Sequence, residues 1–342
     1  MNPFSYERVN DVQQALAEIV SLPSASFVAG GTELLNWMKE GIIQSPHLVD
    51  INRLPLATID FDGSILTIGA LARMSEVASH EAVRRSFPAI AESLELSASP
   101  QLRNMASMGG NLMQRTRCPY FRAEIQLPCN KRRARSGCSA LDGENRGHAI
   151  FGWNEHCVAT HASDVAVVLM MLDAVVQASG PHGERSIPLA EFYQAPRDIP
   201  DPDTLLEPNE LITAISVPFS PLARRSRYLK LRERASYEFA LVSAGAGVEL
   251  EGNRIRAIRV ALGGVAHKPW RLLRAEEFLV DRELKRDAIF EASRPTLPKP
   301  ARFSTTASRS DLLGGPPREP SKRRGGWHEG NDGRRGFTNG RS

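Results

Sequence analysis

The hydrophobic pattern breaks down between residues 114 and 157, and this break limits the fold more than any other feature. The stretch contains segments such as NKRRARSG and LDGENRG and keeps neither the two-residue period of a strand nor the period of a helix. All the cysteines of the chain fall inside it, namely Cys118, Cys129, Cys138 and Cys157. Because a region without regular apolar positions cannot build its own core, bound thiol ligands are a natural source of its order.

Three kinds of site suit four clustered cysteines. Paired disulfides are typical of secreted domains, whereas this N-terminus shows no export signal and a chain of 342 residues can bury a large core without cross-links. A four-cysteine zinc site usually contains C-x2-C pairs, which are missing here. An iron–sulfur cluster takes four thiolates that need not be closely spaced. The spacing therefore favours a metal or cluster site over disulfides and leaves the metal open.

Charge is distributed unevenly along the chain. The cysteine region contains four closely spaced basic residues, Lys131, Arg132, Arg133 and Arg135. They either offset the negative charge of a thiolate-ligated cluster or belong to an ordinary solvated loop. Residues 295–342 hold ten Lys/Arg against four Asp/Glu, while the first 294 residues carry a net charge of −2. This acidic body gives no electrostatic case for a nucleic-acid binder. The longest apolar run, residues 165–172, is far too short to span a membrane.

Outside the cysteine region, the periodicity predicts a mixture of helices and strands. Helices are expected at residues 11–20, 32–39, 74–80 and 88–97, and again from Ser163, which can cap the helix of SDVAVVLMMLDAVVQ. Strands are expected at residues 25–29, 47–51, 64–68, 210–217, 228–231, 240–250 and 255–262. A second domain is expected to begin near Ser220.

Two glycine pairs occur in FVAGGTELL (residues 27–35) and in SMGGNL (residues 107–112). A glycine pair between a strand and a helix lets the backbone approach a ligand, and the helix N-terminus then presents N–H groups to a phosphate. The spacing is not G-x-G-x-x-G, so the Rossmann fingerprint is absent. Each pair alone is equally typical of a plain turn, and Thr32 either donates its hydroxyl to a phosphate or caps the helix.

Taken together, these segments resemble the FAD-binding medium subunit of the molybdenum hydroxylases, the group of xanthine dehydrogenase and carbon monoxide dehydrogenase. Within that family the resemblance is greatest to the periplasmic aldehyde oxidoreductase branch. It is carried by FVAGGTELLNWMK, QLRNMASMGGNLMQRTRCPYFR, PCNKR, SGCSALDG, ATHASDVAV, KLRERASYEFALVS and VALGGVAHKPWR. The resemblance extends over roughly residues 1–294.

The resemblance implies an α+β fold with a flavin-binding domain over residues 1–220, itself made of two α/β subdomains. A [4Fe–4S] insertion is expected at residues 114–157 of this domain. Residues 221–294 are expected to form a C-terminal domain of antiparallel sheet and helices, lacking the family's final helix.

The same resemblance assigns residues to two cofactors. The FAD pyrophosphate is expected along the first glycine loop, with a second loop and three separate side chains completing the site. The flavin residues implied in this way are Phe27, Val28, Ala29, Gly30, Gly31, Thr32, Glu33, Leu34, Leu35, Ser107, Gly109, Gly110, Asn111, Asp164, Ile212 and Lys230. The [4Fe–4S] ligands implied are Cys118, Cys129, Cys138 and Cys157. Simpler roles remain open: Asp164 as a helix cap, Ile212 as a core residue and Lys230 as a surface residue.

The resemblance also implies a function in electron transfer. A large partner subunit would oxidise an aldehyde or a xanthine-type substrate at a molybdenum–pterin centre. A small partner subunit with two [2Fe–2S] clusters would pass the electrons to FAD in this chain, and FAD would pass them to an external acceptor. A stand-alone flavin-dependent oxidase is the alternative. The chain is expected in the periplasm, exported with a partner, or in the cytoplasm.

The tail over residues 295–342 departs from this pattern. It is rich in Gly, Pro and Arg and poor in apolar residues, so we expect it to be disordered. Its composition is typical of an out-of-frame translation of GC-rich DNA, which is a hypothesis that sequencing of the coding region would test.

Overall fold

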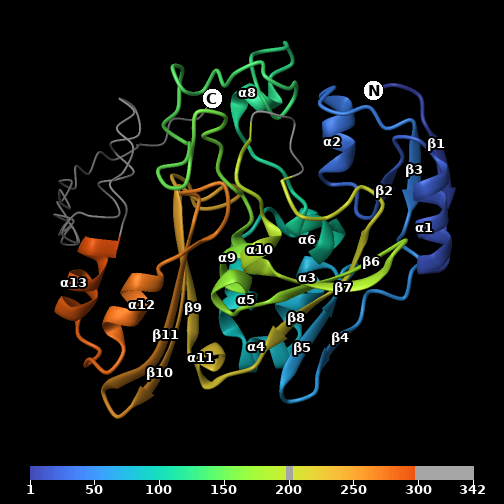
Figure 1. Ribbon diagram of the computed structural model, residues 1–342. Coiled ribbons are helices and arrows are strands. Elements are labelled where there is room, and N and C mark those ends of the chain that lie inside the picture. The colour runs from blue at the N-terminus through green and yellow to red at the C-terminus, as the bar shows by residue number, and fades with distance from the viewer. Residues whose placement is uncertain (198–202, 297–342) are drawn as a thin grey trace, which may run out of the picture.

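The computed structural model describes residues 1–197 and 203–296, and the chain begins with a small parallel sheet (Figure 1). Its strand order is β1-β3-β2. Parallel neighbours cannot be joined by tight hairpins, so helices connect these strands. The elements of this unit are β1 (Ser5–Arg8), α1 (Val12–Ser21), β2 (Ser26–Val28), α2 (Leu34–Lys39) and β3 (His47–Asp50).

The first predicted helix is confirmed as α1, and its local sequence explains both its start and its orientation. The side chain of Asp11 accepts a hydrogen bond from the Gln14 N–H at 2.8 Å, which satisfies a free donor of the first turn. Ala15, Leu16 and Ile19 lie on one buried face, where they join the core that also contains residues of β3.

A five-stranded antiparallel sheet follows, with the order β4-β5-β8-β6-β7. Strand β5 pairs with β8 from Ile65↔Pro218 to Gly69↔Ala214. After β5 the chain leaves the sheet, returns to form β6 and β7, and then fills the position between β5 and β6 with β8. The strands are β4 (Ile59–Phe61), β5 (Ile65–Gly69), β6 (Val175–Gly180), β7 (Gly183–Pro188) and β8 (Leu211–Pro218). The helices between β5 and β8 are α3 (Met74–Ser79), α4 (Glu81–Ser86), α5 (Pro88–Glu95), α6 (Pro100–Met105), α7 (Met108–Leu112), α8 (Pro119–Arg122), α9 (Asp164–Met171) and α10 (Leu189–Phe192).

Helix α9 lies in the middle of the molecule, and all of its residues are buried. Ser163 caps it as predicted, accepting a hydrogen bond from the Ala166 N–H at 3.1 Å. The prediction was wrong about its length, because the residues from Val175 onward belong to β6 instead. The chain turns at Asp173, whose φ is +54°, and uniform hydrophobicity hid the change from helix to strand.

The C-terminal part is a four-stranded antiparallel sheet of order β12-β11-β10-β9, as expected. Val260 packs with the terminal helices and its neighbour Ala261 with the core around α9, so both faces of the sheet are covered. The elements are α11 (Pro221–Arg224), β9 (Ser226–Leu231), β10 (Val242–Glu251), β11 (Arg254–Gly263), β12 (Trp270–Arg271), α12 (Leu273–Leu279) and α13 (Arg286–Thr296).

Residues 114–157 form irregular loops that gather with α8 at the end of the molecule where α2 also lies (Figure 1). The expectation that no apolar core orders this region needs correction at its C-terminal part. Ile150 and Phe151 are buried against Val265 of the C-terminal sheet region, and the Ile150 N–H donates to the Val265 carbonyl at 2.8 Å. The region is therefore anchored by packing near residue 150 as well as by polar contacts.

None of the helices described here is long and apolar enough to cross a bilayer. The predicted disorder of the tail concerns residues that, from 297 onward, lie outside the described ranges. The proposed domain boundaries remain predictions.

Candidate functional site

The first glycine loop packs directly against the segment that leads into the second. A Cβ atom on Gly30 would lie 1.9 Å from the Met105 carbonyl oxygen, so only glycine fits. Gly31 has a φ of +70°, a left-handed conformation that L side chains rarely adopt. The first glycine pair, far away in the sequence, therefore lies against the residues that immediately precede the second.

Two polar residues that the sequence analysis did not identify hold these loops together. Arg73 donates one hydrogen bond to the Met105 carbonyl at 2.7 Å and another to the Asn52 side chain at 2.8 Å. Asn52 in turn donates to the Ala29 carbonyl at 3.0 Å. No local motif indicates this bridge, because its members come from four separate parts of the chain.

The first loop offers its main chain to a ligand. Within the described part of the chain, the backbone N–H groups of residues 30–33 donate no hydrogen bond to a protein acceptor. Adjacent free N–H groups before a helix form a concave anion-binding surface. The Thr32 side chain does not cap α2, because the cap residue is Glu33 and no side-chain cap bond is present.

Side chains of the first loop point into the protein instead. Phe27 and Ala29 pack against the core of the parallel sheet, whereas Val28, Leu34 and Leu35 belong to a second apolar cluster with Met38. Because these side chains are used for packing, a pyrophosphate here would be held by the backbone of residues 30–33.

The second glycine pair lies in the first turn of α7, rather than in a loop. Ser107 is the cap residue and accepts from the Gly110 N–H at 3.3 Å, while the Gly109 N–H donates to the Ala70 carbonyl at 2.8 Å. The Asn111 N–H donates to the Ser107 carbonyl at 2.9 Å. These N–H donors are therefore engaged within the protein, and the flavin contacts of this segment stay a prediction.

Asp164 is a buried hydrogen-bond centre, so the simple cap is excluded. It accepts from Lys230 Nζ at 2.8 Å, from Ser97 Oγ at 3.0 Å and from Tyr228 Oη at 2.5 Å. Lys230 is almost fully buried and also donates to the Leu96 carbonyl at 3.1 Å, which excludes a surface role. Burial and the adjacent Asp164 carboxylate raise the pKa of Tyr228 well above its usual range.

The remaining predicted flavin residues occupy different environments. Asn111 accepts a hydrogen bond from Ser163 Oγ at 2.6 Å, which links α7 to the start of α9. Ile212 in β8 belongs to the main hydrophobic core. The structure thus brings the glycine loops together, connects them to the α9 terminus, and leaves Ile212 as a packed core side chain.

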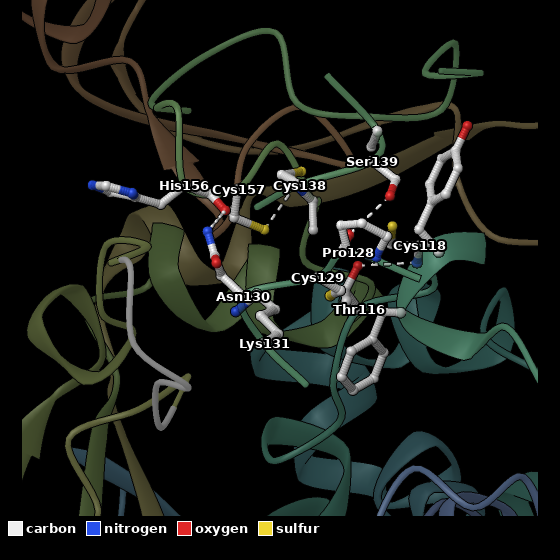
Figure 2. A pocket seen from close by; sticks show the side chains of 14 residues that line it. Thr116, Cys118, Pro128, Cys129, Asn130, Lys131, Cys138, Ser139, His156 and Cys157 are labelled. Atoms are coloured by element: carbon white, nitrogen blue, oxygen red, sulfur yellow. Dashed lines mark hydrogen bonds between the residues drawn. The ribbon is translucent and has the colours of Figure 1, made fainter. Parts of the chain in front are cut away.

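The four cysteines surround one small pocket, as Figure 2 shows. All are free thiols, which disfavours the disulfide interpretation. Cys129 and Cys138 face each other in an isolated antiparallel bridge. His148 Nε2 lies 3.2 Å from Cys118 Sγ. Residues separated by up to 39 positions therefore converge, as a shared ligand site requires.

Backbone N–H groups point at three of these sulfurs. Cys118 receives hydrogen bonds from Tyr120 and Phe121, Cys129 from Lys131 and Arg132, and Cys157 from Ala159. Donors of this kind stabilise thiolates and tune iron–sulfur clusters. Burial nevertheless raises the pKa of Cys118 to about 12 and that of Cys157 to about 11. Ligation of a metal or cluster would therefore release protons.

The four cysteines are compatible in type and placement with thiolate ligands of a cluster. Among the described residues, no three His, Cys, Asp or Glu side chains lie close enough together to hold one metal ion. A cubane cluster separates its four thiolates more widely than one ion does, and four cysteines around one pocket with N–H donors suit that arrangement. The iron–sulfur insertion stays a prediction.

The basic residues of the insertion have separate roles. Lys131 lines the pocket and pairs with Asp203, to which Arg115 Nε also donates at 2.7 Å. Burial alone would raise the pKa of Asp203, but these two cations lower it to about 2. Arg132 donates to the Ala123 carbonyl at 2.6 Å and so braces the loop. The alternative of a solvated loop therefore fails for Lys131 and Arg132, whereas Arg133 and Arg135 are exposed.

Two buried histidines, His161 and His267, lead us to expect that the protein loses stability in acid. Burial lowers the pKa of His161 and of His267 to about 4, and His161 Nε2 and His267 Nδ1 have no partner among the described residues. Both imidazoles stay neutral in the folded chain, whereas in the unfolded chain they bind protons below a pKa of roughly 6.5. The folded state is therefore fully stable above that pH and loses stability as the pH falls toward 4. We expect each histidine to lower the free energy of unfolding by about 2 kcal/mol at pH 5, relative to pH 7.

Urea unfolding at pH 7 and pH 5 measures this loss. His267→Gln should reduce the pH dependence by about half, and the exposed His182→Gln should leave it unchanged. Equal pH dependence in the wild type and both variants would contradict the assignment.

Comparison with known proteins identifies the class. The family described as "FAD binding domain in molybdopterin dehydrogenase" matches residues 2–220, and the "CO dehydrogenase flavoprotein C-terminal domain" matches residues 227–310. The chain therefore belongs to the FAD-binding subunits of the molybdenum hydroxylases, and FAD is its cofactor, as the resemblance predicted.

Individual relatives refine this placement. The aldehyde oxidoreductase FAD-binding subunit PaoB of Escherichia coli (strain K12) is 48% identical over 299 residues, which cover 86% of this chain and 92% of that protein. The carbon monoxide dehydrogenase medium chain of Hydrogenophaga pseudoflava is 28% identical and covers 85% and 84%. A solved structure of carbon monoxide dehydrogenase from the same organism, lacking the Mo-pyranopterin moiety, matches with a TM-score of 0.68, 25% identity and 92% and 94% coverage.

Proposed function

We propose that this chain is the electron-transfer flavoprotein subunit of a molybdenum-dependent aldehyde oxidoreductase. A large molybdenum–pterin subunit would oxidise the substrate, and a small subunit with [2Fe–2S] clusters would deliver electrons to this chain, which would pass them to an external acceptor. The 48% identity to an aldehyde oxidoreductase FAD-binding subunit over most of both chains favours an aldehyde over a purine.

One observation carries the cofactor part of this proposal. The first glycine loop lies against Met105, just before the second glycine pair. In this position the N–H groups of residues 30–33 have no acceptor among the described residues. Bound FAD supplies the ability to accept and donate electrons. The protein's part is to hold the pyrophosphate on these N–H groups, while Arg73 and Asn52 fix the loops that present them.

We further propose that Cys118, Cys129, Cys138 and Cys157 ligate a [4Fe–4S] cluster. Their common pocket, their free thiols and the backbone N–H groups directed at three of them support this assignment. Lys131, buried beside the pocket, would offset part of the negative charge of the thiolates.

The division of labour predicts a clear difference between the isolated chain and the complex. Purified alone, the chain should carry about one FAD and should not oxidise an aldehyde with an artificial acceptor. Coexpressed with the molybdenum and [2Fe–2S] subunits, it should copurify with them, and its flavin absorbance should bleach when aldehyde is added. Aldehyde turnover by the isolated chain would instead support a stand-alone flavin-dependent oxidase.

A further inference from the structure

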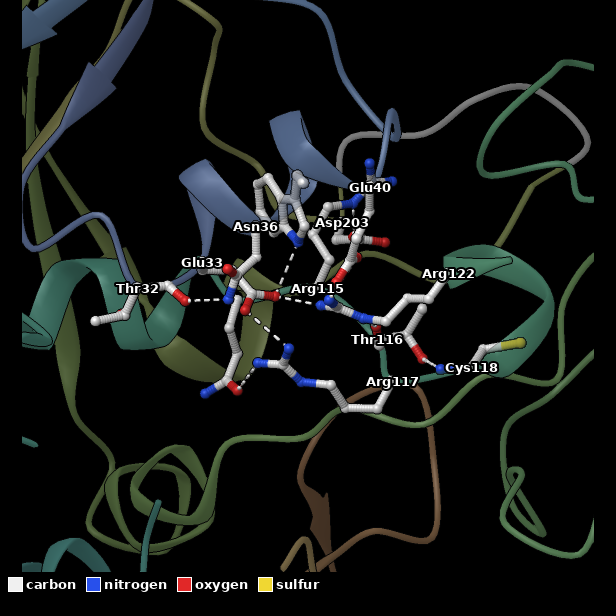
Figure 3. Close-up of polar contacts among 12 residues, drawn as sticks. Thr32, Glu33, Asn36, Glu40, Arg115, Thr116, Arg117, Cys118, Arg122 and Asp203 are labelled. Atoms are coloured by element: carbon white, nitrogen blue, oxygen red, sulfur yellow. Dashed lines mark hydrogen bonds and ion pairs between the residues drawn. The ribbon is translucent and has the colours of Figure 1, made fainter. Parts of the chain in front are cut away.

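The side chain of Glu33 connects the two regions that the proposed function assigns to different cofactors (Figure 3). Glu33 belongs to the first glycine loop and is the cap residue of α2. Its carboxylate pairs with Arg117 at 2.8 Å and with Arg122 at 2.5 Å, using one oxygen for each guanidinium. Both arginines belong to the cysteine insertion, so an ion-pair triad joins loop and insertion.

The triad is largely removed from water. The side chain of Glu33 is 16% exposed, that of Arg122 16% and that of Arg117 28%. Burial lowers the pKa of the Arg117 guanidinium, and the Glu33 carboxylate opposes that effect. Removing one member of such a group leaves an uncompensated buried charge, which is costly, so the triad holds the two regions in one arrangement.

Both arginines are fixed by the turn that carries the first cysteine. Arg117 precedes Cys118 in the chain, and Cys118 is the cap residue of α8, which contains Arg122. Thr116 stiffens this turn at both ends: its hydroxyl accepts from the Cys118 N–H at 3.1 Å, and its carbonyl accepts from Arg122 Nε at 3.1 Å. A change in the order of the Cys118 turn therefore moves both partners of Glu33.

On the other side, Glu33 is tied to the loop that would hold the pyrophosphate. Its own N–H is among the free donors of residues 30–33, and its carboxylate also accepts from Trp37 Nε1 of α2 at 2.9 Å. The position of the side chain thus restrains the orientation of the backbone beside it.

We propose that Glu33 is a positioning residue that couples flavin affinity to the occupancy of the cysteine site. This inference rests on the proposed function. Ligation of Cys118 orders its turn, the turn fixes Arg117 and Arg122, and these hold Glu33 and the adjoining N–H groups in the geometry that binds the pyrophosphate. By thermodynamic linkage, FAD must stabilise the cluster by the same factor.

A double-mutant cycle on the full chain, purified anaerobically, tests this coupling. FAD affinity is measured by titration for the wild type, Glu33→Gln, Cys138→Ser and the double variant. Loss of the cluster should weaken FAD binding about tenfold in the wild-type background. In the Glu33→Gln background the same loss should change affinity less than about twofold. Glutamine keeps the size of the side chain and an acceptor for Trp37 while removing the charge.

Glu40→Gln is the matched control. Glu40 pairs with the same Arg122 at 3.2 Å but does not contact Arg117 and lies outside the glycine loop. This variant should keep the tenfold dependence on the cluster. A second measurement uses the intact ligand set: FAD should slow the release of iron from the wild type to a chelator and should not slow it in Glu33→Gln.

The outcomes separate this inference from the function on which it rests. Suppose that wild-type protein contains iron and FAD, but that loss of the cluster does not weaken FAD binding, or weakens it equally in Glu33→Gln. The coupling is then wrong, while the proposed function stands. Wild-type protein that lacks FAD or iron would overturn both.

Discussion

Replacing Gly30 with alanine is expected to abolish FAD binding, with an affinity loss of at least about 100-fold, or ~2.7 kcal/mol. A methyl group at this position would lie 1.9 Å from the carbonyl oxygen of Met105 and 2.7 Å from its carbonyl carbon. These are backbone atoms, so the collision cannot be relieved by a side-chain rotation and must separate the two loops. Flavin absorbance of the purified variant and titration with FAD measure the effect.

Two further glycines separate the loss of loop contact from backbone strain. Gly31→Ala should weaken FAD binding less, because its Cβ would meet only the flexible side chain of Leu35, at 2.9 Å, and the left-handed conformation costs about 1–2 kcal/mol. Gly252→Ala carries a similar φ of +59° in open space, remote from the site, and should retain FAD. A Gly30→Ala protein with full flavin content would contradict the site.

Replacing Cys138 with serine is expected to lower the iron content strongly and to disorder much of residues 114–157. If thiolate ligation orders the part of this region that lacks regular secondary structure, as we propose, a missing ligand leaves little there to replace it. Flavin content should fall less, since the free N–H groups of residues 30–33 lie outside the insertion. Iron analysis, the visible spectrum and limited proteolysis measure the three effects.

Ser139→Ala provides a control from the same pocket. It removes the hydrogen bond from Ser139 Oγ to the Pro128 carbonyl, at 2.9 Å, without removing a thiol, so iron should be retained. Zinc in place of iron, or two disulfides after anaerobic purification, would show that the [4Fe–4S] assignment is wrong. Burial near Ile150 and Phe151 should protect the C-terminal part of the insertion from proteolysis even in Cys138→Ser.

Much of the fold follows from local patterns in the sequence. The helix at Val12–Ser21 was predictable because its apolar spacing and its cap agree, and β9, β10 and β11 of the C-terminal sheet were predictable from their apolar runs, whereas β12 was not predicted. Strand β1 was not, since all four of its residues are exposed and show no alternation. The end of α9 was hidden because its sequence is apolar on every side, which is typical of a buried helix and a buried strand alike.

Prediction of the site from the sequence is limited in the same way, because many of its contacts join segments that are far apart in the chain. The glycine pairs and the cysteines could be identified because their residue types are unusual in such patterns. Arg73, Asn52 and the arginine partners of Glu33 could not, because their roles arise only when distant segments meet. Lys230 looked like an ordinary strand residue, and its burial against Asp164 depends on the packing of β9 beside α5 and of the neighbouring β10 beside α9.

The hydrogen bond between Asn111 and Ser163 has an evolutionary consequence. It joins the points at which the chain leaves for the cysteine insertion and returns from it, so the intervening residues form an appendage whose ends meet on the surrounding scaffold. We expect such an arrangement to let the insertion be gained, lost or exchanged with little change in the path of the sheets, apart from its packing at Ile150 and Phe151. After such an insertion is acquired, ion pairs join it to the rest of the chain, such as Glu33 with Arg122 and Asp203 with Lys131. Each added ion pair would make a later loss of the insertion more destabilising.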